Sequence, residues 1–170
     1  MPGVKKNKLI KLDISFGELP DGHQFIRPKN FDPLKYPWGL KNESVEEAFS
    51  GFLLNRIPGE QRGRFMDELW RVLIPSGKVT IIVPYWTSPR SIQDPSSAWP
   101  PIVEQSFLYF NKGWRESQKI YNTFRCDFDF TYGHSMDQET LSRNDETRPF
   151  WIKHYINSVT DLHVTLTKRK

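Results

Sequence analysis

The clearest pattern along the chain lies between residues 60 and 83. Apolar residues recur at helical spacing over residues 60–73: Phe65, Leu69, Val72 and Leu73. Pro75 and Gly77 stop this helix. The next six residues, KVTIIV at 78–83, are mostly β-branched, which is typical of a strand buried on both faces. Helix, tight turn and buried strand in this order predict half of an α/β unit.

A second set of patterns predicts the remaining strands. Residues 9–14 (LIKLDI) form a short apolar run that suits a central parallel strand. Residues 124–132 and 162–166 alternate apolar with polar positions, as strands with one apolar face do. Residues 23–38 leave room for one short strand at 24–27 but not for a crossover helix as well, so we expect an abbreviated parallel sheet.

The connections are expected to be helical or irregular. A long loop covers residues 85–101 and contains Trp86, Trp99 and several prolines, and loops of this length are uncommon unless they are functional or flexible. Periodicity does not decide between strand and helix for residues 45–54. Short helices are expected at residues 104–111, 114–121, 137–144 and 149–155.

Length and composition favour one cytoplasmic domain. The 170 residues are enough for one core, and residues 1–8 read as a flexible basic tail. The chain has neither a run of about 18 apolar residues nor an apolar signal-peptide segment, so we expect no membrane span and a cytoplasmic location. Cys126 is the only cysteine, which excludes an intrachain disulfide and a cysteine-rich zinc site.

Charge and histidine spacing disfavour two further classes of function. The net charge of +4 comes largely from lysines and arginine at the two ends, a pattern typical of solvated tails rather than of a nucleic-acid-binding face. The four histidines are scattered and have no pairing at metal-ligand spacing, so no metal site is expected.

Four segments in order resemble the class I S-adenosylmethionine-dependent methyltransferases, especially short methyltransferase-like proteins of phages and environmental bacteria. They are GEQRGRFMDELWRVLIPSGKVTIIVPYWTSPRSIQDP, SFLYFNKGWRE, CDFDFTYG and DLHVTLTKR. The resemblance implies an α/β, Rossmann-like methyltransferase fold whose abbreviated parallel sheet ends in an antiparallel strand pair. It also favours a strand at residues 48–53 and places the cofactor across the carboxyl ends of the first strands.

The resemblance weakens at the cofactor site. The family motif D-x-G-x-G reads Asp13-Ile14-Ser15-Phe16-Gly17 here, so a side chain stands where a glycine is expected. No acid matches the ribose-binding position, where Arg27 and Lys29 stand instead. Asp32 matches the acid that holds the adenine amino group. The resemblance thus implies Asp13, Gly17 and Asp32 as cofactor-binding residues, although Asp13 and Asp32 also suit ordinary turns.

The acceptor side also departs from the family. Asn55 and Arg56 stand where relatives have a Glu-His pair, and Ser97 stands where they have histidine. The resemblance leaves Tyr85, Asp94 and Trp99 as candidates for a loop over the substrate; large aromatics beside prolines can equally pin such a loop to the core. No catalytic residue is identified.

Two hypotheses follow. In the first, the protein is a methyltransferase-like pseudoenzyme with an eroded S-adenosylmethionine site, uses no cofactor and acts through a protein partner or a second copy of itself. In the second, it is an active methyltransferase that holds S-adenosylmethionine in a modified pocket through Asp13, Gly17 and Asp32. The lost ribose acid and the substituted glycine favour the first hypothesis, because both remove interactions that catalysis would draw on.

Overall fold

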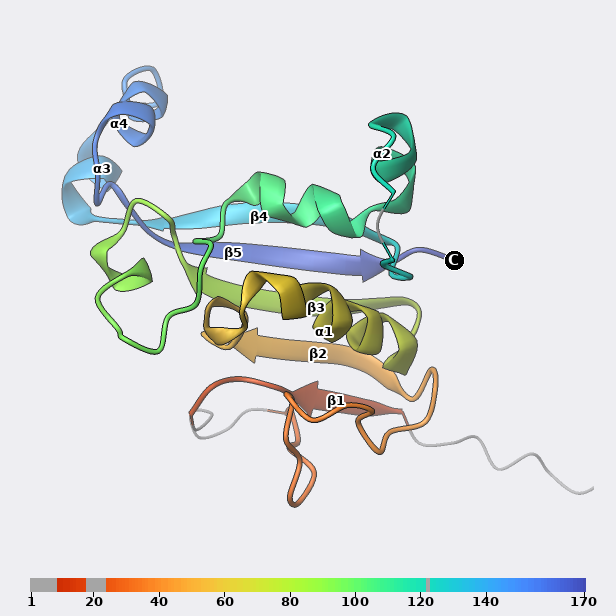
Figure 1. The fold of residues 1–170 in the computed structure, drawn as a ribbon. Helices are drawn as coiled ribbons and strands as arrows, with labels where there is room; N and C mark the ends of the chain where they lie inside the picture. Colours follow the sequence, from red (N-terminus) through yellow and green to blue (C-terminus); the bar gives the residue numbers. More distant parts are fainter. Residues whose placement is uncertain (1–8, 18–23, 122) are drawn as a thin grey trace, which may run out of the picture.

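A computed structural model describes residues 9–17, 24–121 and 123–170. The predicted basic tail at residues 1–8 lies outside this range. The described residues form a five-stranded sheet in the order β1-β2-β3-β5-β4 (Figure 1). The strands are β1 (Ile10–Asp13), β2 (Val45–Gly51), β3 (Leu73–Pro84), β4 (Phe128–Met136) and β5 (Val159–Lys168).

Helical segments connect the strands. Between β2 and β3 lie η1 (Leu54–Arg56) and α1 (Gly59–Val72). The remaining segments are η2 (Pro89–Ser91), η3 (Glu104–Phe110), α2 (Lys112–Ser117), α3 (Gln138–Ser142) and α4 (Arg148–His154). None of the described helices is long and apolar enough to cross a membrane.

The sheet topology confirms the predicted fold class. β1, β2 and β3 are parallel neighbours, whereas β5 is antiparallel to both β3 and β4. The parallel part is short, as expected, because residues 24–27 contribute only one bridge, from Ile26 to Leu12, instead of a strand. The carboxyl ends of β1, β2 and β3 therefore meet at one edge of the sheet, near the end of β4.

Burial on the sheet is one-sided. Figure 1 shows α1 and η3 over the same face of the sheet. The residues that point to this face are fully buried: Val79, Ile81, Val83, Leu162, Val164 and Leu166. The opposite face carries the cross-strand pairs Thr80 with Thr165 and Lys78 with Thr167, which remain partly or fully exposed. The prediction that residues 78–83 are buried on both faces was therefore wrong: the β-branched run includes Thr80 and Ile82, which face solvent in part.

Most predicted elements are present, with shifted ends. Residues 60–73 were predicted as a helix and α1 spans Gly59–Val72, but β3 begins directly at Leu73, so the Pro-Ser-Gly turn lies within the strand's range. The strand expected at residues 48–53 is β2 and ends at Gly51. The strand expected at residues 124–132 begins only at Phe128, because the backbone N–H groups of Arg125 and Cys126 donate to Asp67 on α1 instead of to a neighbouring strand.

Gly63 allows the close approach of Phe124 to α1. A Cβ at position 63 would overlap the Phe124 ring, which also packs against Phe110. Gly→Ala in a helix ordinarily gains about 1 kcal/mol, but overpacking costs about 1–3 kcal/mol. We therefore expect Gly63→Ala to lower the free energy of unfolding by about 1 kcal/mol, measured by urea denaturation.

Gly113→Ala in α2 is the matched control, because a Cβ there would meet its nearest atom at an ordinary 3.5 Å. This variant should be neutral or slightly stabilising. If both variants are equally stable, the contact with Phe124 does not require glycine.

Candidate functional site

The candidate site lies where the parallel strands end. Asp13 closes β1, Gly51 closes β2 and Pro84 closes β3. The long loop at residues 85–101 follows directly from β3. In Figure 1 it lies beside the ends of the strands. In open α/β sheets ligands bind outside the carboxyl ends of the strands, so this edge is the candidate for ligand recognition.

Asp13 is buried and fully engaged by the protein. It is 1% exposed, and its Oδ1 accepts the backbone N–H of Ser15 at 2.9 Å. Its Oδ2 accepts from Arg27 Nε at 2.9 Å and forms an ion pair with Arg27 Nη2. Arg27 Nη2 also donates to the carbonyl oxygen of Ser15 at 2.9 Å. Both carboxylate oxygens therefore have partners, and the negative charge is neutralised.

Hydrogen bonds hold the turn after β1 against β2. Ser15 Oγ accepts the backbone N–H of Gly51 at 2.8 Å, which ties β1 to β2. The left-handed backbone falls on Gly17, with φ of +84°, and Ser15 is not among the described non-glycine residues of positive φ. Ser15 therefore fits the turn without the backbone strain that a glycine position could have imposed.

Arg56 links this turn to the long loop. Its guanidinium lies 3.6 Å from the centroid of the Phe16 ring, and its Nη2 is 2.5 Å from Asp94 Oδ2. Asp94 Oδ1 accepts the backbone N–H of Ser96 at 2.8 Å. The pKa of Asp94 lies below its usual range. The largest cause is the hydrogen bond from the Ser96 backbone, followed by those from the side chains of Ser96 and Arg56. Asp94 thus ties the loop to Arg56, whose guanidinium lies over Phe16.

Two other predicted residues serve turns and loop attachment. Asp32 is exposed and its Oδ1 accepts the backbone N–H of Leu34 at 2.9 Å; no hydrogen bond among the described residues joins it to Asp13 or Gly17. The carbonyl oxygen of Trp99 accepts the N–H of Gly59 at 3.0 Å. The Trp99 ring is 80% exposed, so the backbone and not the aromatic ring pins the loop.

Tyr85 belongs to a polar cluster that the sequence analysis missed. Its hydroxyl donates to Glu104 Oε2 at 3.3 Å, and His134 Nε2 lies 2.5 Å from Glu104 Oε1. The Tyr85 and His134 rings meet edge to face at 5.2 Å. Glu104 and Tyr85 are buried, so this is a largely desolvated carboxylate, phenol and imidazole beside the end of β3.

Two features of the sequence pointed to this cluster, one in β4 and one after the long loop. The alternation Phe128, Phe130, Tyr132 continues to His134, which places the histidine on the helix-covered face of β4. Glu104 opens η3 immediately after the long loop. No three His, Cys, Asp or Glu side chains in the described part of the chain are grouped so that they could hold a metal ion.

Comparison with solved structures identifies the fold. A SAM-dependent methyltransferase from Archaeoglobus fulgidus aligns with 86% of this chain and 68% of its own, at a TM-score of 0.54 and 13% identity. The fold is that of the class I S-adenosylmethionine-dependent methyltransferases. At this identity the likeness establishes the methyltransferase fold alone.

Two further methyltransferase structures match with lower TM-scores. A putative sarcosine dimethylglycine methyltransferase from Galdieria sulphuraria has a TM-score of 0.49 at 17% identity; the match covers 81% of this chain but only 57% of that protein. An S-adenosylmethionine-dependent methyltransferase from Mesorhizobium loti has a TM-score of 0.44 at 14% identity; the match covers 88% of this chain and 72% of that protein. No protein-family model and no curated protein matches the chain.

The methyltransferase fold places its cofactor across the carboxyl ends of the first strands. Asp13, the acid at the end of β1, is already paired with a cation of the protein. The cofactor carries a cationic sulfonium, an ammonium group and a carboxylate; its ammonium group would compete with Arg27 for Asp13, whereas its carboxylate could pair with Arg27. Ser15 Oγ is also engaged, because it accepts the backbone N–H of Gly51.

Arg27 is expected to stabilise the fold by pairing a buried charge. Arg27→Gln leaves the Asp13 carboxylate without its cationic partner, and Arg27 is itself about one-third exposed (36%), which moderates the loss. We expect a drop of about 1–3 kcal/mol in the free energy of unfolding, measured by urea denaturation at neutral pH. Lys29→Gln, an exposed neighbour, should change it by less than about 0.5 kcal/mol; equal effects would contradict a specific ion pair.

Tyr85 makes stability sensitive to alkaline pH. Burial, followed by the charge of Glu104, raises the pKa of Tyr85 to about 12, compared with about 10 in an unfolded chain. The folded state therefore holds the phenolic proton more tightly, so this contribution is intact below about pH 10 and is lost as the pH rises towards 12. Tyr85→Phe should flatten this fall in the free energy of unfolding. Parallel pH curves for the two proteins would contradict the prediction.

Proposed function

We propose that this protein is a methyltransferase-fold pseudoenzyme that binds no S-adenosylmethionine at the inherited position and acts by binding another protein. The observation that carries the proposal is the ion pair of Asp13 with Arg27. The carboxylate that the family turns towards the cofactor is used here to hold the protein's own arginine. A ligand that binds Asp13 would have to displace Arg27. It would then have to replace Arg27 as the partner of the buried carboxylate, which is costly to leave unpaired.

The surroundings support the same conclusion. Arg56 spans from Phe16 to Asp94 and so connects the turn after β1 with the long loop. The region that receives ribose in the family has Arg27 and no described acid. Catalysis requires contacts to the substrate and cofactor that become stronger in the transition state. A site that makes few contacts to the cofactor can supply little of this stabilisation.

Exposed aromatic side chains favour a protein partner. Phe16, Trp86 and Trp99 are more than half exposed, and all three belong to the turn and loop at the carboxyl edge. Aromatic residues are enriched in the buried centres of protein interfaces. An edge that offers aromatic side chains on a loop held by ion pairs suits protein binding better than enclosure of a nucleoside.

Titration calorimetry with S-adenosylmethionine and S-adenosylhomocysteine tests the proposal. We expect no heat of binding at millimolar ligand. A dissociation constant near micromolar, about −8 kcal/mol, would refute the pseudoenzyme.

Two variants sharpen this test. Arg27→Ser frees the Asp13 carboxylate, and Lys29→Ser removes an exposed neighbouring charge without touching Asp13. If the ion pair is the main obstacle, weak binding should appear in Arg27→Ser and not in Lys29→Ser. Binding that is strong in the wild type and lost in Arg27→Ser would show that Arg27 is a ligand-binding residue and not a block.

A second candidate function is an active methyltransferase in which Asp13, Gly17 and Asp32 bind S-adenosylmethionine and residues 85–99 cover the acceptor. The cluster of Tyr85, Glu104 and His134 favours it, because a buried carboxylate next to an imidazole could position or deprotonate an acceptor. The same titration separates the two functions. If S-adenosylmethionine binds, loss of methyl transfer in His134→Gln with unchanged cofactor affinity would assign the cluster to the acceptor.

A further inference from the structure

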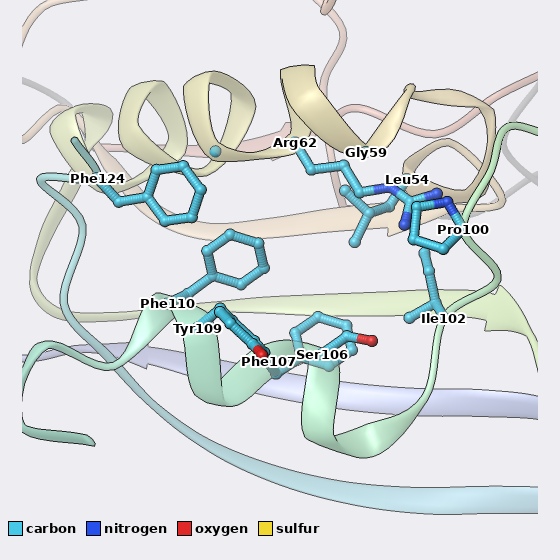
Figure 2. Close-up of a pocket in the computed structure, with 11 residues that line it drawn as sticks. Leu54, Gly59, Arg62, Pro100, Ile102, Ser106, Phe107, Tyr109, Phe110 and Phe124 are labelled. Carbon is cyan, nitrogen blue, oxygen red and sulfur yellow. The ribbon is translucent and has the colours of Figure 1, made fainter. Parts of the chain in front are cut away.

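A pocket of about 360 Å³ lies between α1 and η3, on the helix-covered face of the sheet (Figure 2). None of its lining residues belongs to the Asp13 site. Most of the lining is apolar: Leu54, Pro100, Ile102, Phe107, Phe110 and Phe124. The volume and the lining are those of sites that bury small apolar ligands.

Two glycines of α1 shape this pocket. A Cβ at Gly59 would lie 2.7 Å from the ring of Pro100, and one at Gly63 would overlap Phe124. The missing side chains let Pro100 and Phe124 approach α1 at the two ends of the hollow, as Figure 2 shows. Close contacts of Pro100 and Phe124 with α1 therefore bound the pocket at its two ends.

Arg62 is a buried cation in the lining. It is 7% exposed, its Nε donates to the carbonyl oxygen of Ile57 at 2.9 Å and its Nη2 to that of Ala98 at 3.2 Å. No carboxylate of the described residues forms an ion pair with it.

Burial lowers the pKa of Arg62 to about 10, although the charge of the exposed Glu60 acts in the opposite direction, so the guanidinium is still charged at neutral pH. Two neutral carbonyl groups satisfy hydrogen bonds but do not neutralise that charge. Arg62 and Pro100 both line the pocket (Figure 2).

We propose that this pocket binds a small apolar carboxylate, whose anionic group pairs with Arg62 and whose hydrocarbon part lies against Phe107, Phe110 and Phe124. The apolar lining favours a hydrophobic body, and the unpaired buried guanidinium favours an anion, for which its planar donors are well matched. The proposal does not depend on the state of the Asp13 site.

Calorimetry with decanoate and 2-naphthoate tests the proposal, and decanol serves as the uncharged counterpart of decanoate. We expect saturable binding of at least one carboxylate below millimolar concentration, and at least tenfold weaker binding of decanol. Arg62→Gln should weaken carboxylate binding at least tenfold. Arg64→Gln, an exposed arginine on the same helix outside this pocket, should leave it within twofold.

A pocket-filling variant keeps the test valid if Arg62→Gln fails to fold. Ser106→Leu adds volume to the lining and should abolish binding, with folding checked by circular dichroism. The proposal is overturned if neither carboxylate binds at millimolar concentration, if decanol binds as tightly as decanoate, or if Ser106→Leu binds like the wild type.

Discussion

The structure depends on burying one face of its sheet beneath α1 and η3. Val79, Ile81 and Val83 of β3 and their partners on β5 all turn to that face, where the apolar stripe of α1 meets them. Hydrophobic burial is the dominant favourable term in folding, so the side that is covered decides which residues can be apolar. The opposite face can then carry threonines, and the ion pair of Lys11 with Glu47 lies on neighbouring strands there.

The short parallel sheet determines the chemistry at its edge. Residues 24–27 contribute a bridge beside β1 and not a full strand, and this segment brings Arg27 to Asp13. This segment therefore supplies a cation that pairs with the neighbouring acid. At this edge the side chains of Asp13, Arg27 and Ser15 are therefore engaged with one another and with the backbone, in a chain that has the methyltransferase fold.

The sequence predicted those features that local pattern controls. The helical period of Phe65, Leu69 and Val72 located α1, and alternation located β5, because both patterns record which side of a regular element is buried. The departure of Arg27 from the family pattern was also visible, but its partner was not. The start of β4 was misplaced because Asp67, far away in the chain, takes the backbone N–H groups of Arg125 and Cys126.

The sequence alone thus determined the α/β class and the main helix, since both follow from patterns among neighbouring residues. Only the tertiary structure decided that Arg27 pairs with Asp13, that Tyr85, Glu104 and His134 meet, and that Arg62 lies buried without an acidic partner among the described residues. The first two sets of contacts join residues that are 14 to 30 positions apart in the sequence. The burial of Arg62 depends on which segments pack around its side chain. The strength of a charge depends on its burial and partners, and both exist only once the chain has folded.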